Sequence, residues 1–209
     1  MKHRMILLSI AVPAALVFLL TASLQTSAHR HLPFSKNTVC TPLSIVVREE
    51  RLANSRRHPA PALEDGDILV TKCTHSFGWR HGHAALVIDA ANGLTLEAVT
   101  LGVPSAAGTV EGWRSYPSFT VLRLKGADLD FRRQIARHAA KELDGLPYRL
   151  TSGLWGEKLA VPPQGSQCAY LVWYAYAYYG YDLDGDGGKL VTVDDLLQSP
   201  LLEAAAEFM

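Results

Sequence analysis

Short apolar segments rich in β-branched residues, separated by turn residues, dominate residues 63–124. The clearest is Ala84-Ala85-Leu86-Val87-Ile88, which follows His83 directly. Turns are indicated by Glu64-Asp65-Gly66 and by Asn92-Gly93, and such a pattern is typical of strands joined in hairpins. The predicted strands are 67–71, 83–89, 95–100, 109–113 and 118–124.

The period of the apolar positions changes after residue 126. Residues 127–143 place apolar side chains at helical spacing, with Asp128 or Asp130 as N-cap and Gly145 just past the end. Further helices are predicted over 169–179, over 193–197 behind the cap Thr192, and over the charged segment 46–53. Strands followed by helices predict an α+β fold with a small antiparallel sheet packed against helices.

The N-terminus has the pattern of a secretory signal. Lys2, His3 and Arg4 precede the apolar stretch 5–20, and small polar residues follow to Ala28. We expect a signal peptide over 1–28, or an uncleaved anchor since the apolar stretch nearly reaches spanning length. A poorly patterned lead-in over 29–62 and a catalytic domain over 63–209 complete the expected organisation. The expected location is the periplasm, the cell envelope or the extracellular space.

Composition narrows the possible partners. The 209 residues carry 20 Lys plus Arg against 20 Asp plus Glu, and a nucleic-acid-binding domain would need a basic face. Of the three cysteines, Cys40 and Cys73 are the natural disulfide pair in an oxidising compartment, which would leave Cys168 free. The alternative is three free, buried thiols.

Cys168 lies between the polar turn Gln164-Gly165-Ser166-Gln167 and an apolar helical run. A helix start offers unpaired N–H groups and the positive end of the dipole, and both favour a thiolate. The thiol is therefore a candidate nucleophile, with its own backbone N–H as an oxyanion donor. The competing interpretation is a small buried side chain that begins a core helix.

His83 is the preferred general base because it heads an apolar strand, and His81 is the second choice. The competing interpretations are a solvated loop histidine, or a zinc pair of His81 and His83 that would need Cys73 or His75 as a third ligand. No zinc-binding spacing supports the latter.

Glu97 is the candidate orienting group, because it lies inside an apolar strand where a carboxylate needs a partner. The alternative is a strand position that faces solvent. A strict two-residue turn at Asn92-Gly93 would pair Ile88 with Glu97 and put His83 on the opposite face. A shared face therefore requires an odd-length loop or a bulge in the hairpin.

These segments together resemble the circularly permuted, YiiX-like branch of the NlpC-type papain-like superfamily, in which the His and third-residue strands precede the Cys helix. The resemblance covers about residues 63–202. It implies that Cys168 is the nucleophile, His83 the base and Glu97 the third member, and it makes Tyr148 an oxyanion or substrate-binding candidate. The segments that carry it are Gly66-Asp67-Ile68-Leu69, Gly82-His83-Ala84-Ala85-Leu86-Val87, Leu96-Glu97-Ala98, Cys168-Ala169-Tyr170-Leu171-Val172 and, for Tyr148, Gly145-Leu146-Pro147-Tyr148.

An acidic turn adds a weak calcium candidate. Asp182, Asp184 and Asp186 match the first half of a calcium loop, but the twelfth position is Val193 instead of Glu. The alternative is a solvated acidic turn, and no other cofactor is expected.

The expected function is an exported cysteine amidase or peptidase acting on cell-envelope amide bonds through a Cys-His-Glu triad. The alternatives are a lipid acyltransferase or thioesterase with the same triad, and a non-catalytic envelope-binding module. The expected partner is a peptide or lipid-amide substrate, with no nucleic acid, and with the membrane contacted only through an uncleaved N-terminal segment.

Overall fold

The computed structural model describes residues 38–42 and 47–209, and their side chains from Val47 onward. These residues belong to one compact unit, which therefore includes part of the predicted lead-in. The predicted signal segment lies outside the described residues. No helix within the described ranges has both the length and the apolar character that crossing a membrane would require.

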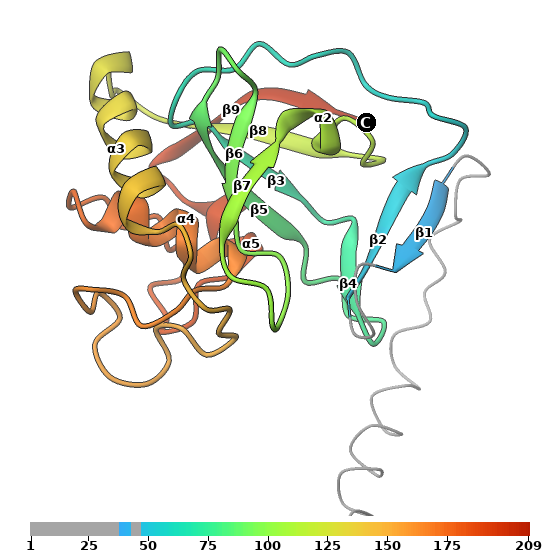
Figure 1. Cartoon of the computed structure of the whole chain (residues 1–209). Coiled ribbons are helices and arrows are strands. Elements are labelled where there is room, and N and C mark those ends of the chain that lie inside the picture. The colour runs from blue at the N-terminus through green and yellow to red at the C-terminus, as the bar shows by residue number, and fades with distance from the viewer. Residues whose placement is uncertain (1–37, 43–46) are drawn as a thin grey trace, which may run out of the picture. The chain divides into compact units, whose positions relative to one another are not determined.

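The larger sheet is antiparallel and has six strands in the order β7-β6-β5-β3-β8-β9, and a second sheet has the order β1-β2-β4 (Figure 1). The strands are β1 (Thr38–Pro42), β2 (Val47–Leu52), β3 (Ile68–Thr71), β4 (Thr74–Ser76), β5 (His83–Asp89), β6 (Leu94–Glu97), β7 (Ala106–Thr109), β8 (Phe119–Leu124) and β9 (Leu202–Phe208). The helices are α2 (Val110–Trp113), α3 (Leu129–Glu142), α4 (Cys168–Ala177) and α5 (Val193–Gln198). The structure thus confirms the α+β prediction.

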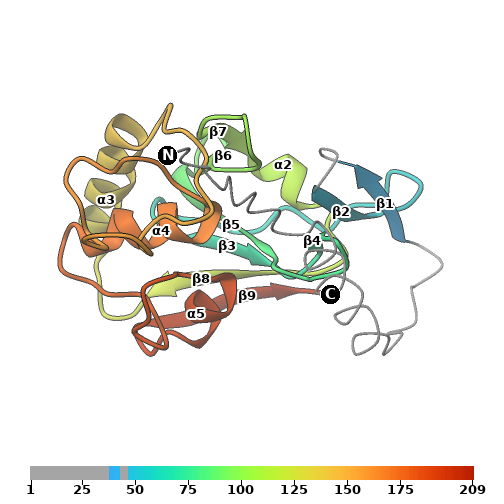
Figure 2. The same cartoon turned by 90° about the horizontal axis from the view of Figure 1, so that it is seen from below.

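Alternation along the strands builds two cores, one on each face of the larger sheet. Even-numbered residues of β5 such as Ala84 and Leu86 pack against α3 and α4, whereas Ala85 and Val87 pack against Trp113 and its neighbours. Figure 2 shows α3 and α4 together on one side and α2 on the other. Helix α4 is buried from Cys168 to Tyr176, which explains its apolar character on all sides.

Two predicted elements were wrong. Residues 46–53 were predicted to be helical, but Val47–Leu52 is a strand between β1 and β4. The strand is favoured because its charged residues are buried with hydrogen-bond partners; Glu49, for example, accepts a hydrogen bond from the Tyr116 hydroxyl at 2.5 Å. Residues 109–113 were predicted to be a strand, but Thr109 ends β7 in an extended conformation and a short helix follows. The helix buries Val110 and Trp113 three residues apart on one face.

The predicted Cys40–Cys73 disulfide was also wrong, since Cys73 is a free buried thiol. Cys40 is the register partner of Glu50 in the β1–β2 ladder, and the Glu50 N–H donates to the Cys73 carbonyl on the other side. One strand therefore separates the two cysteines. Two strand spacings are about 9–10 Å, which exceeds the Cα separation of a disulfide.

Candidate active site

A β-bulge places His83 and Glu97 on one face of the sheet. In the β5–β6 hairpin Val87 pairs with Thr95 but Asp89 pairs with Leu94, so Ile88 is an extra residue. Because residues two apart share a face, the shifted register brings Glu97 to the side that carries His83. Of the two arrangements predicted to give a shared face, an odd-length loop or a bulge, the structure has the bulge.

The imidazole and the carboxylate are in contact. His83 Nε2 and Glu97 Oε2 are 2.8 Å apart, and His83 is only 4% exposed. The other carboxylate oxygen, Oε1, accepts from the Thr95 hydroxyl at 2.6 Å and from the Trp113 indole N–H at 3.0 Å. The Trp113 ring also stacks on the imidazole, with centroids 5.4 Å apart and planes 16° apart. The carboxylate is thus held by two further hydrogen bonds, and the imidazole by a stacked ring.

Glycine at position 108 makes room for this carboxylate. A Cβ atom at Gly108 would lie 2.3 Å from Glu97 Oε1 and 2.8 Å from Thr95 Oγ1. Strand β7 pairs directly with β6 here, so the strand backbone itself closes one side of the carboxylate. Any side chain at this position must displace Glu97 or separate the two strands.

Charge pairing dominates the electrostatics of the site. Burial by itself works to lower the pKa of His83, but hydrogen bonds with Cys168 and Glu97, together with their negative charges, raise it to about 10. Burial works to raise the pKa of Glu97, yet the hydrogen bond and charge of His83 outweigh it and hold that pKa below its usual value. The pair is therefore an imidazolium and a carboxylate at neutral pH.

Cys168 begins α4, and its interaction with the same imidazole contributes to the raised pKa of His83. Since Nε2 of His83 is engaged by Glu97, Nδ1 is the ring nitrogen that remains for the sulfur. Gln167 caps the helix by accepting from the Ala169 N–H at 2.8 Å, and its Oε1 is 3.6 Å from the Cys168 sulfur. Within residues 47–209 the Cys168 backbone N–H donates to no protein acceptor, so it is open to an oxyanion.

Tyr148 lies near the sulfur. It forms a bridge with Ser166, two residues before Cys168. Burial first, and then the negative charge of Cys168, raise the pKa of Tyr148 far above its usual value. The phenol therefore stays protonated near neutral pH and is available to donate a hydrogen bond beside the thiol.

His81, the second candidate base, is engaged elsewhere. Its Nε2 is 2.9 Å from the Ser76 hydroxyl and its Nδ1 is 2.7 Å from the Gly82 carbonyl oxygen. Gly82 has φ of +77°, and a Cβ there would lie 2.5 Å from the Thr71 carbonyl oxygen. Only glycine therefore fits at position 82, between the two histidines. Among the described residues they share no metal-binding cluster with Cys73 or His75.

The acidic turn gathers carboxylates, but in a different set from the predicted one. Oxygens of Asp184, Asp186 and Asp195 lie within 4.8 Å of one another, whereas Asp182 accepts from the Trp173 indole N–H at 2.7 Å. The Lys158 ammonium forms an ion pair with Asp184 and donates to the Gly188 carbonyl. A resident ammonium already compensates the buried carboxylate, so this set fits a calcium ion poorly.

Sequence reasoning missed the three side chains that hold the site together. Thr95 could have been found, because it lies two residues before Glu97 and must share its face. Gln167 directly precedes Cys168 and is the N-cap of α4, which begins one residue before the predicted helix 169–179. Trp113 is the last residue of the segment 109–113 that was wrongly assigned to a strand, so nothing in the sequence connected it to His83.

Comparison with known proteins gives one structural likeness. No family model matches the chain, and no curated protein matches it. The fold is similar to the crystal structure of the metalloprotein YiiX from Escherichia coli O157:H7, described as DUF1105, with a TM-score of 0.53 and 17% sequence identity. The match covers 69% of this chain and 97% of YiiX. The likeness shows a shared YiiX-like fold.

Proposed function

We propose that the chain is a papain-like thiol hydrolase of the NlpC type, with Cys168 as nucleophile, His83 as acid and base, and Glu97 as the orienting group. The observation that supports this most strongly is the shared imidazole. His83 is hydrogen-bonded to a buried carboxylate, and its pKa is raised by an interaction with Cys168, the only thiol at a helix start among the described residues. Structural ion pairs seldom include a cysteine, whereas thiol hydrolases require one.

The reaction follows from these positions. The Cys168 thiolate attacks an amide carbonyl carbon and forms a C–S bond, and the carbonyl electron pair moves to oxygen. The Cys168 N–H and the Tyr148 hydroxyl are the groups available to stabilise that oxyanion. The imidazolium of His83 donates its proton to the leaving amine as the C–N bond breaks. Water then attacks the thioester carbon and His83 accepts a proton from the water. The C–S bond breaks, and the carboxylic acid leaves with the thiolate–imidazolium pair restored.

The proposed substrate is an amide of the cell envelope, since the N-terminal pattern favours export. The same thioester could pass its acyl group to an amine or a lipid acceptor instead of water. Thiol chemistry of this kind needs no metal ion. The structural neighbour is named a metalloprotein. Among the described residues the carboxylate cluster of Asp184, Asp186 and Asp195 already contains an ion pair, between Asp184 and Lys158.

Alkylation by iodoacetamide tests the proposal without knowledge of the substrate. Cys168 should react rapidly at neutral pH, and His83→Ala should lower its rate by at least roughly tenfold, because the imidazolium that stabilises the thiolate is removed. Cys73 is a free, buried thiol outside the site and serves as the internal reference. Equally slow labelling of both cysteines in the wild type would overturn the proposal and favour a binding module. Mass spectrometry of products from cell walls and lipid extracts then separates hydrolysis from acyl transfer.

A further inference from the structure

Exposed apolar side chains gather in the loops next to the three proposed catalytic residues. Eight of the twelve large exposed apolar side chains among the described residues lie in three loops. One loop leads into His83, one follows Glu97 and one leads into Cys168. We call these eight residues the apolar rim: Phe77, Trp79, Leu101, Val103, Leu150, Trp155, Leu159 and Val161.

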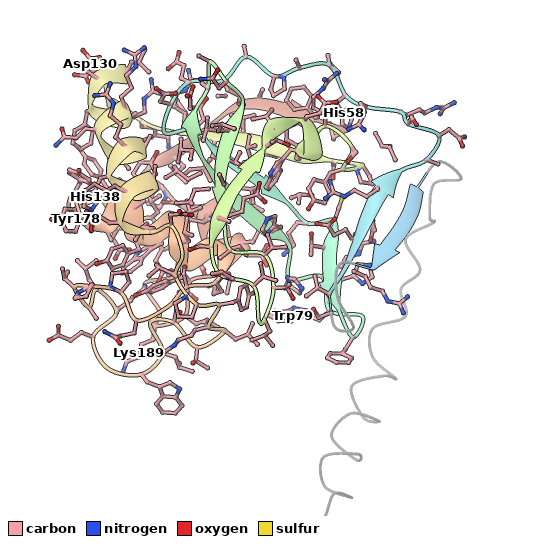
Figure 3. All side chains as sticks on the ribbon, in the orientation of Figure 1. His58, Trp79, Asp130, His138, Tyr178 and Lys189 are labelled. Carbon is pink, nitrogen blue, oxygen red and sulfur yellow. The ribbon has the colours of Figure 1, made fainter. Side chains whose placement is uncertain are left out.

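Backbone hydrogen bonds bring the loops of the rim to one end of the sheet. The Ser105 N–H donates to the Leu146 carbonyl, and the Gly145 N–H donates to the Ser105 carbonyl, so the second and third loops adjoin. The first loop is fixed to the start of β5 by the Gly82 N–H, which donates to the Thr74 carbonyl. Figure 1 shows all three loops along its lower edge, where Trp79 is labelled in Figure 3.

The loop tips project into open space. A Cβ atom at Gly78, Gly102 or Gly156 would meet no atom within 4 Å. Phe77 and Gly78, with φ of +49° and +83°, form a tight turn closed by two backbone hydrogen bonds between Ser76 and Trp79. Positive φ is unfavourable for a bulky residue, and Phe77 recovers nothing by packing because it is 89% exposed. The turn holds a phenyl ring outward at a cost to the fold, which points to a role at the surface.

We propose that the apolar rim docks on a lipid bilayer and thereby presents the active-site end of the sheet to the membrane. Separate projecting tips suit a deformable bilayer better than a flat protein surface, and Trp and Phe favour the membrane interface. Arg149 and Lys189 directly precede apolar residues, Leu150 in the rim and Leu190 in an adjacent segment, where cations can meet lipid phosphates. Arg80, which follows Trp79, is already paired with Glu50 at 2.5 Å. Glu157 opposes these cations in charge, so apolar insertion should dominate over attraction to anionic lipid.

The N-terminal sequence is consistent with this partner. The apolar stretch 5–20 predicts that the chain is directed to a membrane, and residues 21–37 join it to β1. The docking proposal does not depend on the proposed hydrolase activity, and alkylation of Cys168 tests that activity separately.

The tryptophans of the chain provide the probe. Trp79 and Trp155 belong to the rim and are 66% and 79% exposed, whereas Trp113 and Trp173 are buried. The full chain is mixed with vesicles of phosphatidylcholine and phosphatidylglycerol that carry brominated acyl chains, which quench only tryptophans inserted among them. We expect part of the emission to be lost, and the loss to disappear in the double variant Trp79→Phe, Trp155→Phe.

Two controls keep the result specific to the rim, even if the N-terminal stretch holds the chain on the vesicles. Tyr178→Trp, introduced into that double variant, places a reporter at the far end of α4 from Cys168, and it should stay unquenched. Phe77→Ser should weaken quenching several-fold, whereas Leu197→Ser, at an exposed position outside the rim, should not.

Wild-type emission that brominated lipids leave unchanged would overturn the proposal, as would a Tyr178→Trp reporter that is quenched as strongly as the rim. An emission shift with isolated cell-wall polymer but none with vesicles would also overturn it and assign the rim to a polymer.

Discussion

Replacing Trp113 with Phe tests whether the carboxylate of Glu97 must be held for the proposed site to work. The substitution keeps an aromatic ring that can stack on His83 but removes the indole N–H that donates to Glu97 Oε1 at 3.0 Å. A hydrogen bond to a charged group contributes about 1.5–3 kcal/mol. Thr95 remains as a second donor to the same oxygen, so we expect the lower end of that range.

If half or more of that energy holds the carboxylate against His83, Cys168 should lose reactivity by roughly three- to twelvefold, since about 1.4 kcal/mol corresponds to a factor of ten. Thr95→Val removes the other donor at nearly constant volume and should act in the same direction. The double variant should lose more than the sum of the two single effects, because the second loss leaves Oε1 without either donor.

The assay is the rate of Cys168 alkylation, with labelled peptides resolved so that Cys73 reports general opening of the fold. Trp173→Phe is the matched control, since it removes an indole N–H that donates to a different carboxylate, Asp182, at 2.7 Å. A Trp113→Phe protein that alkylates within twofold of wild type would refute the reasoning. So would a Trp173→Phe protein that slows equally.

Three further changes probe the site from other directions. Glu97→Gln should shift the loss of activity at alkaline pH to below pH 10, because the hydrogen bond and charge of Glu97, after those of Cys168, raise the pKa of His83. A pH–rate profile measures this shift, and an unchanged profile contradicts the role proposed for Glu97. Gly108→Ala should lower the free energy of unfolding by about 1–3 kcal/mol because its Cβ would lie 2.3 Å from Glu97 Oε1. Gly112→Ala, whose Cβ would meet nothing closer than 3.9 Å, should be nearly neutral in the same denaturant titration. Lys158→Met should lower that free energy by about 3–5 kcal/mol, because it leaves a buried carboxylate unpaired; calcium should raise the melting temperature of this variant but not of wild type.

Elements whose local and tertiary preferences agree were predicted from the sequence. Strand β5 was predicted with the observed bounds, and α5 follows its predicted cap Thr192, which forms a capping box with Asp195. Strand β9 was missed because Leu202-Glu203-Ala204-Ala205-Ala206 favours a helix by propensity. Its pairing with β8 as an edge strand is a tertiary effect that overrides that preference.

The contact between His83 and Glu97 could not be predicted from the sequence alone. Alternation alone fixes which residues of one strand share a face, but the faces of two strands are related only through the turn between them. The sequence showed that a shared face needs an odd-length loop or a bulge, and the choice of a bulge with Ile88 as the extra residue comes only from the ladder. The bulge does more than place His83 and Glu97 on one face. Because the shift also moves Thr95 onto the face of His83, one extra residue brings both the Glu97 carboxylate and one of its two donors to the imidazole. The contact between His83 and Glu97 therefore depends on the bulge as much as on the two side chains themselves.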